Sequence, residues 1–494
     1  MLVGMKTPTR REALASLLAA PAWAQSGAAS SEWIPLFDGR SLNGWKANEG
    51  GASFRVEEGA IVADGPRSHL FYTGPVQGGV FRNFELRVKA RTTPGANSGV
   101  YFHTRYLEKG WPDRGFEVQV NNSHTGEGSY RERKMTASLY GVRNTYKALA
   151  RDGEWFELRV MVRGKRVEVW CGDVPVVDYV EAEPAVTKSA YGHRLGEGAF
   201  ALQCHDPHSK VFFKDILVRP LADGIASGAA APEVDPLYVD ILRYGEDNLP
   251  LVDYHVHLKG GITLEEALAL SRRHGLMYGL AVNVGLGFPV TSDAGALEFL
   301  AGLRGQPCFA AIQGEGREWP GLVSRETIAK FDYVFTDAMT FRDDRGKRMR
   351  LWMKDEVGAI DDAQAFMETY VNRIEGVMRD EPIDIYANPT FLPEVIARRY
   401  DELWTPERME RVIAAAKKHE VALEINNRYR IPSPEFLKLA KQAGAKFSFG
   451  TNNGGRDDIG RCEYSLAMVK ECGLKWQDIF VPRADGEKKA RRKT

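Results

Sequence analysis

The sequence predicts two domains of different fold class, an all-β antiparallel sandwich followed by an α/β barrel of parallel strands. Between residues 33 and 221, apolar and polar residues alternate with period two, as at 84–88 and 156–162, which is typical of half-buried strands. After a linker at 222–236 that is rich in Gly, Ala and Pro, short apolar runs alternate with amphipathic helical segments. This change from strands alone to strands alternating with helices predicts the change of fold class.

The termini and the composition narrow the functional class. Residues 1–24 combine a twin arginine, a short apolar stretch and small residues, which resembles a twin-arginine export signal and predicts a periplasmic or extracellular protein. Basic and acidic residues balance at 66 each, so no nucleic-acid-binding surface is indicated. Five widely spaced cysteines give no disulfide framework. We expect no integral membrane anchor and a solvated basic tail at 483–494.

Candidate sugar-binding residues follow the strand period in the sandwich. Glu117, Gln119 and Asn121 alternate with apolar residues, as do Gln203 and His205, so each set would line one face of a strand. His103 could end a neighbouring strand on that face, with aromatic edges from Tyr101, Trp111 and Tyr140. A concave face of this chemistry suits a saccharide. A solvated face without a ligand is the other interpretation, because alternation gives every sandwich such a face.

Motifs along the sandwich resemble, in order, those of the 3-keto-disaccharide hydrolase domain family. They lie at 34–45, 97–102, 115–120, 138–141, 153–155 and 202–205. The resemblance implies a concanavalin-like jelly roll that acts on glycosides already oxidised at C3. It also implies a site around Glu117, with Gln119, Tyr140, Gln203 and His205 near the sugar. His103 stands where that family would have an arginine, which would alter the charge or the substrate preference of the pocket.

The chemistry of a 3-keto-glycoside fits these residue types. A ketone at C3 acidifies the C2 proton, so a base can remove this proton and the C1 substituent can leave by elimination; water then adds back. Such a route needs a base with a raised pKa and a group that stabilises the enolate oxygen. Glu117 is the candidate base, and His205 is the candidate acid or oxyanion partner. A metal on His103 or His205 could replace that partner, and the sequence does not choose between these.

The second domain, at 237–482, has seven apolar runs in a strand–helix rhythm. They cover 251–255, 277–284, 307–313, 332–336, 383–387, 421–426 and 446–450. Thr263 with Glu266 forms a capping box that predicts the start of a helix. His255 and His257 would point to one face at the C-terminal end of the first strand, where barrel enzymes collect functional groups.

The run from Asp253 to His257, followed by six further units, resembles the polymerase and histidinol phosphatase (PHP) family, which has a distorted (βα)7 barrel and a metal centre. Where that family places ionic or imidazole ligands, this chain has Asn283, Asn388, Asn452 and Asn453. Amides are weak ligands for zinc or manganese. Two interpretations therefore stay open. One is a single divalent metal ion, with no organic cofactor, held by His255, His257, Glu315 and Asp337. The other is a degenerate barrel whose asparagines hydrogen-bond a neutral polyol.

Together these observations predict an exported carbohydrate-active hydrolase or lyase that cleaves 3-keto-glycosides, with a small carbohydrate as its partner. A metal-dependent phosphoesterase in the barrel, with the sandwich as a sugar-binding module, is one alternative. A non-catalytic carbohydrate-binding protein is the other. The sequence leaves the oligomeric state open.

Overall fold

The computed structural model describes residues 32–49, 51–124, 126, 130–186, 193–343, 346–483 and 488. The predicted export signal lies outside these residues. In the C-terminal tail, Lys488 is buried, and its Nζ donates to the carbonyl oxygens of Ala329 at 3.2 Å and Phe331 at 2.7 Å. The expectation of a solvated tail is therefore wrong at this residue. The described residues contain no helix that is both long and apolar enough to cross a membrane.

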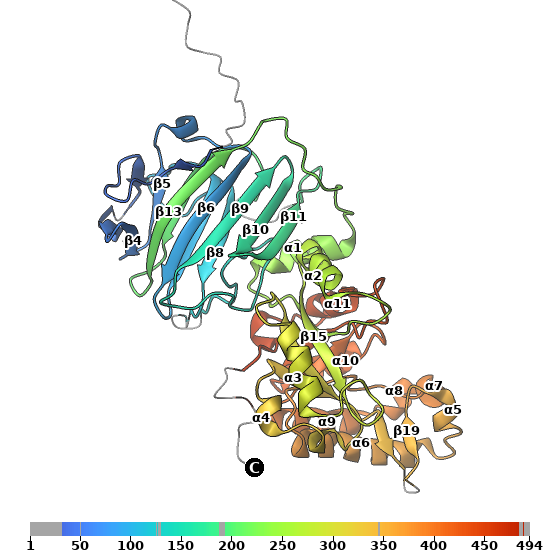
Figure 1. Cartoon of the computed structure of the whole chain (residues 1–494). Helices are drawn as coiled ribbons and strands as arrows, with labels where there is room; N and C mark the ends of the chain where they lie inside the picture. Colours follow the sequence, from blue (N-terminus) through green and yellow to red (C-terminus); the bar gives the residue numbers. More distant parts are fainter. Residues whose placement is uncertain are drawn as a thin grey trace, which may run out of the picture.

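The N-terminal domain is the predicted antiparallel sandwich of two sheets (Figure 1). The eight-stranded sheet has the order β11-β10-β9-β6-β13-β4-β3, with β1 also paired to β13, and the five-stranded sheet has the order β2-β5-β12-β7-β8. The strands are β1 (Ile34–Pro35), β2 (Trp45–Ala47), β3 (Phe54–Glu57), β4 (Ala60–Asp64), β5 (Ser68–Tyr72), β6 (Phe84–Thr92), β7 (Asn97–Thr104), β8 (Phe116–Asn121), β9 (Phe156–Arg163), β10 (Arg166–Cys171), β11 (Val174–Val180), β12 (Ala199–Cys204) and β13 (Lys210–Pro220).

The core of this domain lies between the two sheets. Val118 and Val120 on β8 and Leu202 on β12 point into it together with Leu86 on β6. Because side chains alternate along a strand, the residues next to them in sequence, such as Glu117 and Gln203, point to the outer face of the five-stranded sheet. A smaller apolar cluster of Phe71, Tyr101 and Ala201 lies on that outer face.

The C-terminal domain contains the predicted closed barrel of seven parallel strands, in sequence order. These strands are β14 (Val252–Val256), β15 (Met277–Val284), β16 (Phe309–Gly314), β17 (Tyr333–Thr336), β20 (Ile385–Tyr386), β21 (Ala422–Asn426) and β22 (Phe447–Gly450). A hairpin of β18 (Thr340–Arg342) and β19 (Arg348–Arg350) follows β17; the sequence did not predict it. The likeness to the PHP family stays a prediction.

Helices surround the barrel (Figure 1). They are α1 (Pro236–Glu246), α2 (Leu264–His274), α3 (Asp293–Gly302), α4 (Arg325–Ile328), α5 (Lys354–Val357), α6 (Ala363–Asp380), α7 (Glu394–Ala397), α8 (Tyr400–Leu403), α9 (Pro406–Lys418), α10 (Pro434–Gln442) and α11 (Glu463–Glu471). The predicted capping box at the start of α2 is present, since Thr263 and Glu266 each accept the other's backbone N–H.

Each domain contributes residues to the apolar core of the other. Tyr146 of the sandwich belongs to the apolar core of the barrel, whereas Tyr238 and Leu242 of α1 belong to that of the sandwich. The hydroxyl of Tyr146 donates to the carbonyl oxygen of Leu249 at 3.0 Å, just before β14. The sandwich therefore contacts the N-terminal ends of the barrel strands, and their C-terminal ends form a mouth on the far side.

Candidate active site

Glu117 lies on β8, the strand at one end of the five-stranded sheet, with its side chain on the outer face. It is paired across the ladder with Tyr101, whose hydroxyl donates to Glu117 Oε2 at 2.7 Å. The amide of Gln203 on β12 donates to Glu117 Oε1 at 3.3 Å and to the Tyr101 hydroxyl at 2.9 Å. Burial raises the pKa of Glu117 to about 8, because removal from water disfavours the charged carboxylate. Glu117 can therefore exchange a proton near neutral pH.

Gly99 on β7 makes room for this carboxyl group. A Cβ atom at position 99 would lie 2.2 Å from Glu117 Oε1, which is far inside van der Waals contact. Alternation along the strand did not single out this glycine, because its role depends on the neighbouring strand.

A buried ion pair lies next to Glu117, in the segment after β8. Lys134 Nζ lies 3.4 Å from Glu132 Oε1, and both side chains are almost fully buried. The ammonium group of Lys134 also lies 4.3 Å from the ring centre of Tyr140. Asn121 holds this segment, since its Nδ2 donates to the backbone oxygens of Glu132 and Lys134 at 3.1 and 2.9 Å. Asn121, which was predicted to face the sugar, therefore has a structural role. The ion pair of Glu132 and Lys134 was not predicted from the sequence.

His205 lies beyond the end of β12 in a group of rings. Its Nδ1 is 2.7 Å from Asp206 Oδ2. Its ring centre is 5.6 Å from that of Trp111 and 6.3 Å from that of Tyr130, with which it is stacked. The Tyr130 hydroxyl donates to Glu132 Oε2 at 2.8 Å. Tyr130 therefore connects the group around His205 with the ion pair beside Glu117.

Buried polar atoms on this face have spare hydrogen-bonding capacity. Gln119 Nε2 donates to Asn97 Oδ1 at 2.5 Å. Among the described residues, Gln119 Oε1, Gln203 Oε1 and both ring nitrogens of His69 have no hydrogen-bond partner. Buried polar atoms are rarely left unpaired, so these atoms are suited to the hydroxyl groups of a ligand.

The structure does not bring His103 into this group, which corrects the expectation that it faces the sugar. Its φ is +55°, which breaks the alternation at the end of β7. Its Nε2 lies 2.9 Å from the carbonyl oxygen of Arg82, and its Nδ1 accepts from the Gly196 N–H at 3.2 Å. Its ring packs on Phe84 and Phe102. Burial lowers the pKa of His103 to about 4, so this imidazole is neutral and already bonded through both nitrogens.

Residues 32–219 match the family model of the 3-keto-alpha-glucoside-1,2-lyase-like domain. This lyase-like domain is also similar to a curated 3-keto-disaccharide hydrolase of Bacteroides thetaiotaomicron, with 23% identity over 173 residues, 30% of this chain. The chain spans 58% of the length of that relative.

Solved structures from other organisms match over the same part of the chain. A protein of Parabacteroides distasonis ATCC 8503, provisionally described as a glycosyl hydrolase, has 24% identity and a TM-score of 0.32, covering 38% of this chain and 94% of its own. The carbohydrate-binding module CBM66 of Bacillus subtilis has 13% identity and a TM-score of 0.26, covering 36% of this chain and 95% of its own.

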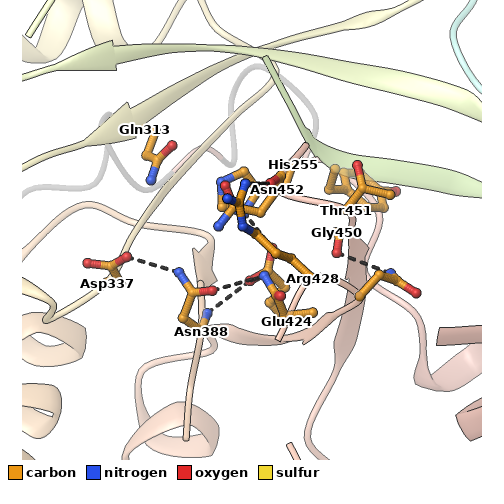
Figure 2. Close-up of polar contacts among 12 residues, drawn as sticks. His255, Gln313, Asp337, Asn388, Glu424, Arg428, Gly450, Thr451 and Asn452 are labelled. Atoms are coloured by element: carbon orange, nitrogen blue, oxygen red, sulfur yellow. Dashed lines mark hydrogen bonds and ion pairs between the residues drawn. The ribbon is translucent and has the colours of Figure 1, made fainter. Parts of the chain in front are cut away.

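The barrel carries the four residues predicted as metal ligands at its C-terminal mouth, outside the lyase-like domain. His255 Nδ1 lies 2.6 Å from Glu424 Oε1, and His257 Nδ1 lies 3.0 Å from the Ala281 carbonyl oxygen. Burial and the nearby Asp337 carboxylate raise the pKa of Glu315 to about 8, and burial raises that of Asp337. An amide donates to each carboxyl group. Asn283 donates to Glu315 at 2.8 Å. Asn388 donates to Asp337 at 3.0 Å (Figure 2).

A divalent metal centre would need at least three of these side chains as ligands. The Nε2 atoms of His255 and His257 are buried and, among the described residues, have no hydrogen-bond partner, as a metal ligand would. However, no group of three or more His, Cys, Asp or Glu side chains in the described part of the chain is placed to hold an ion. Two imidazoles do not make a site, so the donor set does not fit the predicted metal centre.

Proposed function

We propose that the lyase-like domain cleaves the glycosidic bond of 3-keto-glycosides, as a hydrolase or a lyase, by proton abstraction at C2. The observation that carries this proposal is the buried carboxyl group of Glu117, whose pKa is raised to about 8 and which is held by Tyr101 and Gln203. A base works best when its pKa lies near the working pH. The family match over residues 32–219 supports the substrate class.

The proposed reaction uses the side chains of this face in complementary roles. The Glu117 carboxylate takes the C2 proton, and the C2–H electron pair forms the C2=C3 double bond of an enolate, with the negative charge on the C3 oxygen. This enolate then collapses to the C3 ketone and a C1=C2 double bond. The C1–O bond breaks with its electrons on the leaving oxygen, which takes a proton from the group around His205. Both N–H groups of Gln203 are used by Glu117 and Tyr101. The hydrogen bond to the developing enolate oxygen at C3 therefore comes from the ring N–H of His69, whose nitrogens have no hydrogen-bond partner among the described residues. In a hydrolase, water then adds across the double bond and restores the free 3-keto sugar.

Turnover of a nitrophenyl 3-keto-glucoside by the full chain, against its unoxidised parent, tests this proposal. We expect release from the keto form alone, and at least about a 100-fold loss of kcat/KM in Glu117→Gln, as expected for a lost general base. Glu157→Gln, on β9 of the opposite sheet, is the matched control and should keep full activity. Equal turnover by Glu117→Gln would contradict the assignment.

Two further outcomes would favour a metal-dependent reaction or a non-catalytic carbohydrate-binding module instead. We expect chelator treatment to leave keto-glucoside turnover unchanged, and loss of activity that added metal restores would place a metal in the reaction. Saccharide binding without turnover of either glucoside would instead favour a carbohydrate-binding module.

A further inference from the structure

A cavity at the mouth of the barrel has no role in the proposed function of the sandwich. Its volume is about 370 Å³, within the range of small-molecule sites. It lies at the C-terminal ends of the strands, and polar side chains from four of them line it: Asn283 of β15, Gln313 of β16, Asp337 after β17 and Asn388 after β20. The C-terminal ends of barrel strands are where such enzymes place their ligands.

Hydrogen bonds fix the amides of this cavity before any ligand arrives. Asn283 Nδ2 donates to Gln313 Oε1 at 3.0 Å and to Glu315 Oε1 at 2.8 Å. Asn388 Nδ2 donates to Asp337 Oδ2 at 3.0 Å, and Asn388 Oδ1 accepts from Asn426 at 2.9 Å (Figure 2). Fixed amides and carboxyl groups can both donate to and accept from hydroxyl groups without loss of side-chain entropy on binding.

Unpartnered buried atoms also lie at the mouth of the barrel, next to the residues that line the cavity. His255 and His257 are 1% and 2% exposed, and their Nε2 atoms have no hydrogen-bond partner within the described residues. These histidines are not among the residues that line the cavity, but Asn452, which does line it, donates its backbone N–H to the carbonyl oxygen of His255 at 2.9 Å.

The charges and rings of the lining favour a neutral ligand. Basic and acidic side chains line the cavity together, Lys259 and Arg428 with Glu315 and Asp337, so a charged ligand would not meet a lining of one sign. Trp352 lies at the rim and is 38% exposed, with Tyr429 as a second lining ring. An exposed ring beside amides is a surface on which the C–H face of a sugar can stack while its hydroxyl groups hydrogen-bond.

We propose that the mouth of the barrel is a second carbohydrate site, which binds a neutral monosaccharide through Asn283, Asn388, Gln313 and Trp352. The site is separate from the face around Glu117, and it does not depend on the reaction proposed there. The chain would then bind sugar at two places, on the outer face of the sandwich and at the far end of the barrel.

Calorimetric titration of the full chain with D-glucose, D-galactose and D-mannose, with glucose 6-phosphate and inorganic phosphate as anionic comparators, tests this site. We expect a neutral sugar to bind, and Trp352→Ala to weaken its affinity at least tenfold. Met353→Ala is the matched control, because Met353 is equally exposed at 38% but does not line the cavity. Asn283→Ala should weaken binding as well, and it replaces Trp352→Ala if that variant does not fold.

A variant of the sandwich separates the two sites. Gln203→Ala should leave the barrel affinity unchanged if the sugar binds at the mouth. Loss of binding in Gln203→Ala with no change in Trp352→Ala would place the sugar on the sandwich and overturn the proposal. Absence of binding by all three sugars, or tighter binding of phosphate or glucose 6-phosphate, would also overturn it.

Discussion

At the scale of single residues, the raised pKa of Glu117 predicts how kcat/KM depends on pH. The base must be a carboxylate, and burial raises its pKa to about 8, so at lower pH most molecules carry the inactive, protonated form. We expect kcat/KM for a 3-keto-glucoside to rise about tenfold per pH unit below pH 8 and to level off above it. A pH–rate profile of the full chain measures this. A maximum near pH 5 would contradict the assignment of Glu117 as base.

A second prediction at this scale concerns a side chain added at Gly99. Its φ is not in the left-handed region, so alanine fits the backbone, but the added Cβ would lie 2.2 Å from Glu117 Oε1. We expect Gly99→Ala to displace the carboxyl group and to lower kcat about 100-fold while the domain still folds, as measured by turnover and circular dichroism. Gly196→Ala, where nothing lies within 4 Å of the added atom, should be fully active. Normal turnover by Gly99→Ala would show that this position tolerates a side chain.

Sequence could predict part of this site. Strand alternation correctly placed Glu117, Gln119 and Gln203 on one face, because the period of a strand is a local property. It was wrong for His103, where a positive φ turns the side chain away. It could not predict the space at Gly99, because that space exists only when β7 and β8 are paired.

At the scale of elements, the apolar runs located the barrel strands well. The predicted run 277–284 is β15, and the run 446–450 differs from β22 by one residue, because buried parallel strands are continuously apolar. The hairpin of β18 and β19 was missed because these two strands are largely polar and lie mostly outside the core. The sequence also did not predict the ion pair in the segment after β8, because that pair depends on tertiary contacts.

That segment carries the buried ion pair of Glu132 and Lys134, which predicts a coupling in stability. Removing one partner leaves a buried charge uncompensated, at a cost of roughly 3–5 kcal/mol, whereas removing both costs less. We expect Lys134→Met and Glu132→Gln each to lower the free energy of unfolding by about 3 kcal/mol, and the double variant to recover part of this loss. Urea unfolding of the full chain measures all three. Additive losses would show that the two groups are not coupled.

At the scale of the whole molecule, the sandwich and the barrel share contacts that reach the candidate site. Lys134 Nζ donates to Asn248 Oδ1 at 3.3 Å, and Asn248 Nδ2 donates to the Arg131 carbonyl oxygen at 3.0 Å. Asn248 lies between α1 and β14. The segment that carries the ion pair beside Glu117 is therefore held from the barrel side, and the sandwich site is best studied in the full chain.

This shared interface predicts that the two domains unfold together. Tyr146 is 8% exposed and packs in the barrel core, and its hydroxyl bonds to Leu249. Deleting such a buried ring lowers the free energy of unfolding by roughly 3–5 kcal/mol. The packing that is lost lies at the contact between the two domains. We therefore expect a single calorimetric transition for the unaltered chain and two separate transitions for Tyr146→Ala. Tyr106→Ala is the control, because Tyr106 packs on the outer sandwich cluster and should shift a single transition without splitting it. Two transitions in the unaltered chain would show that the interface does not couple the domains.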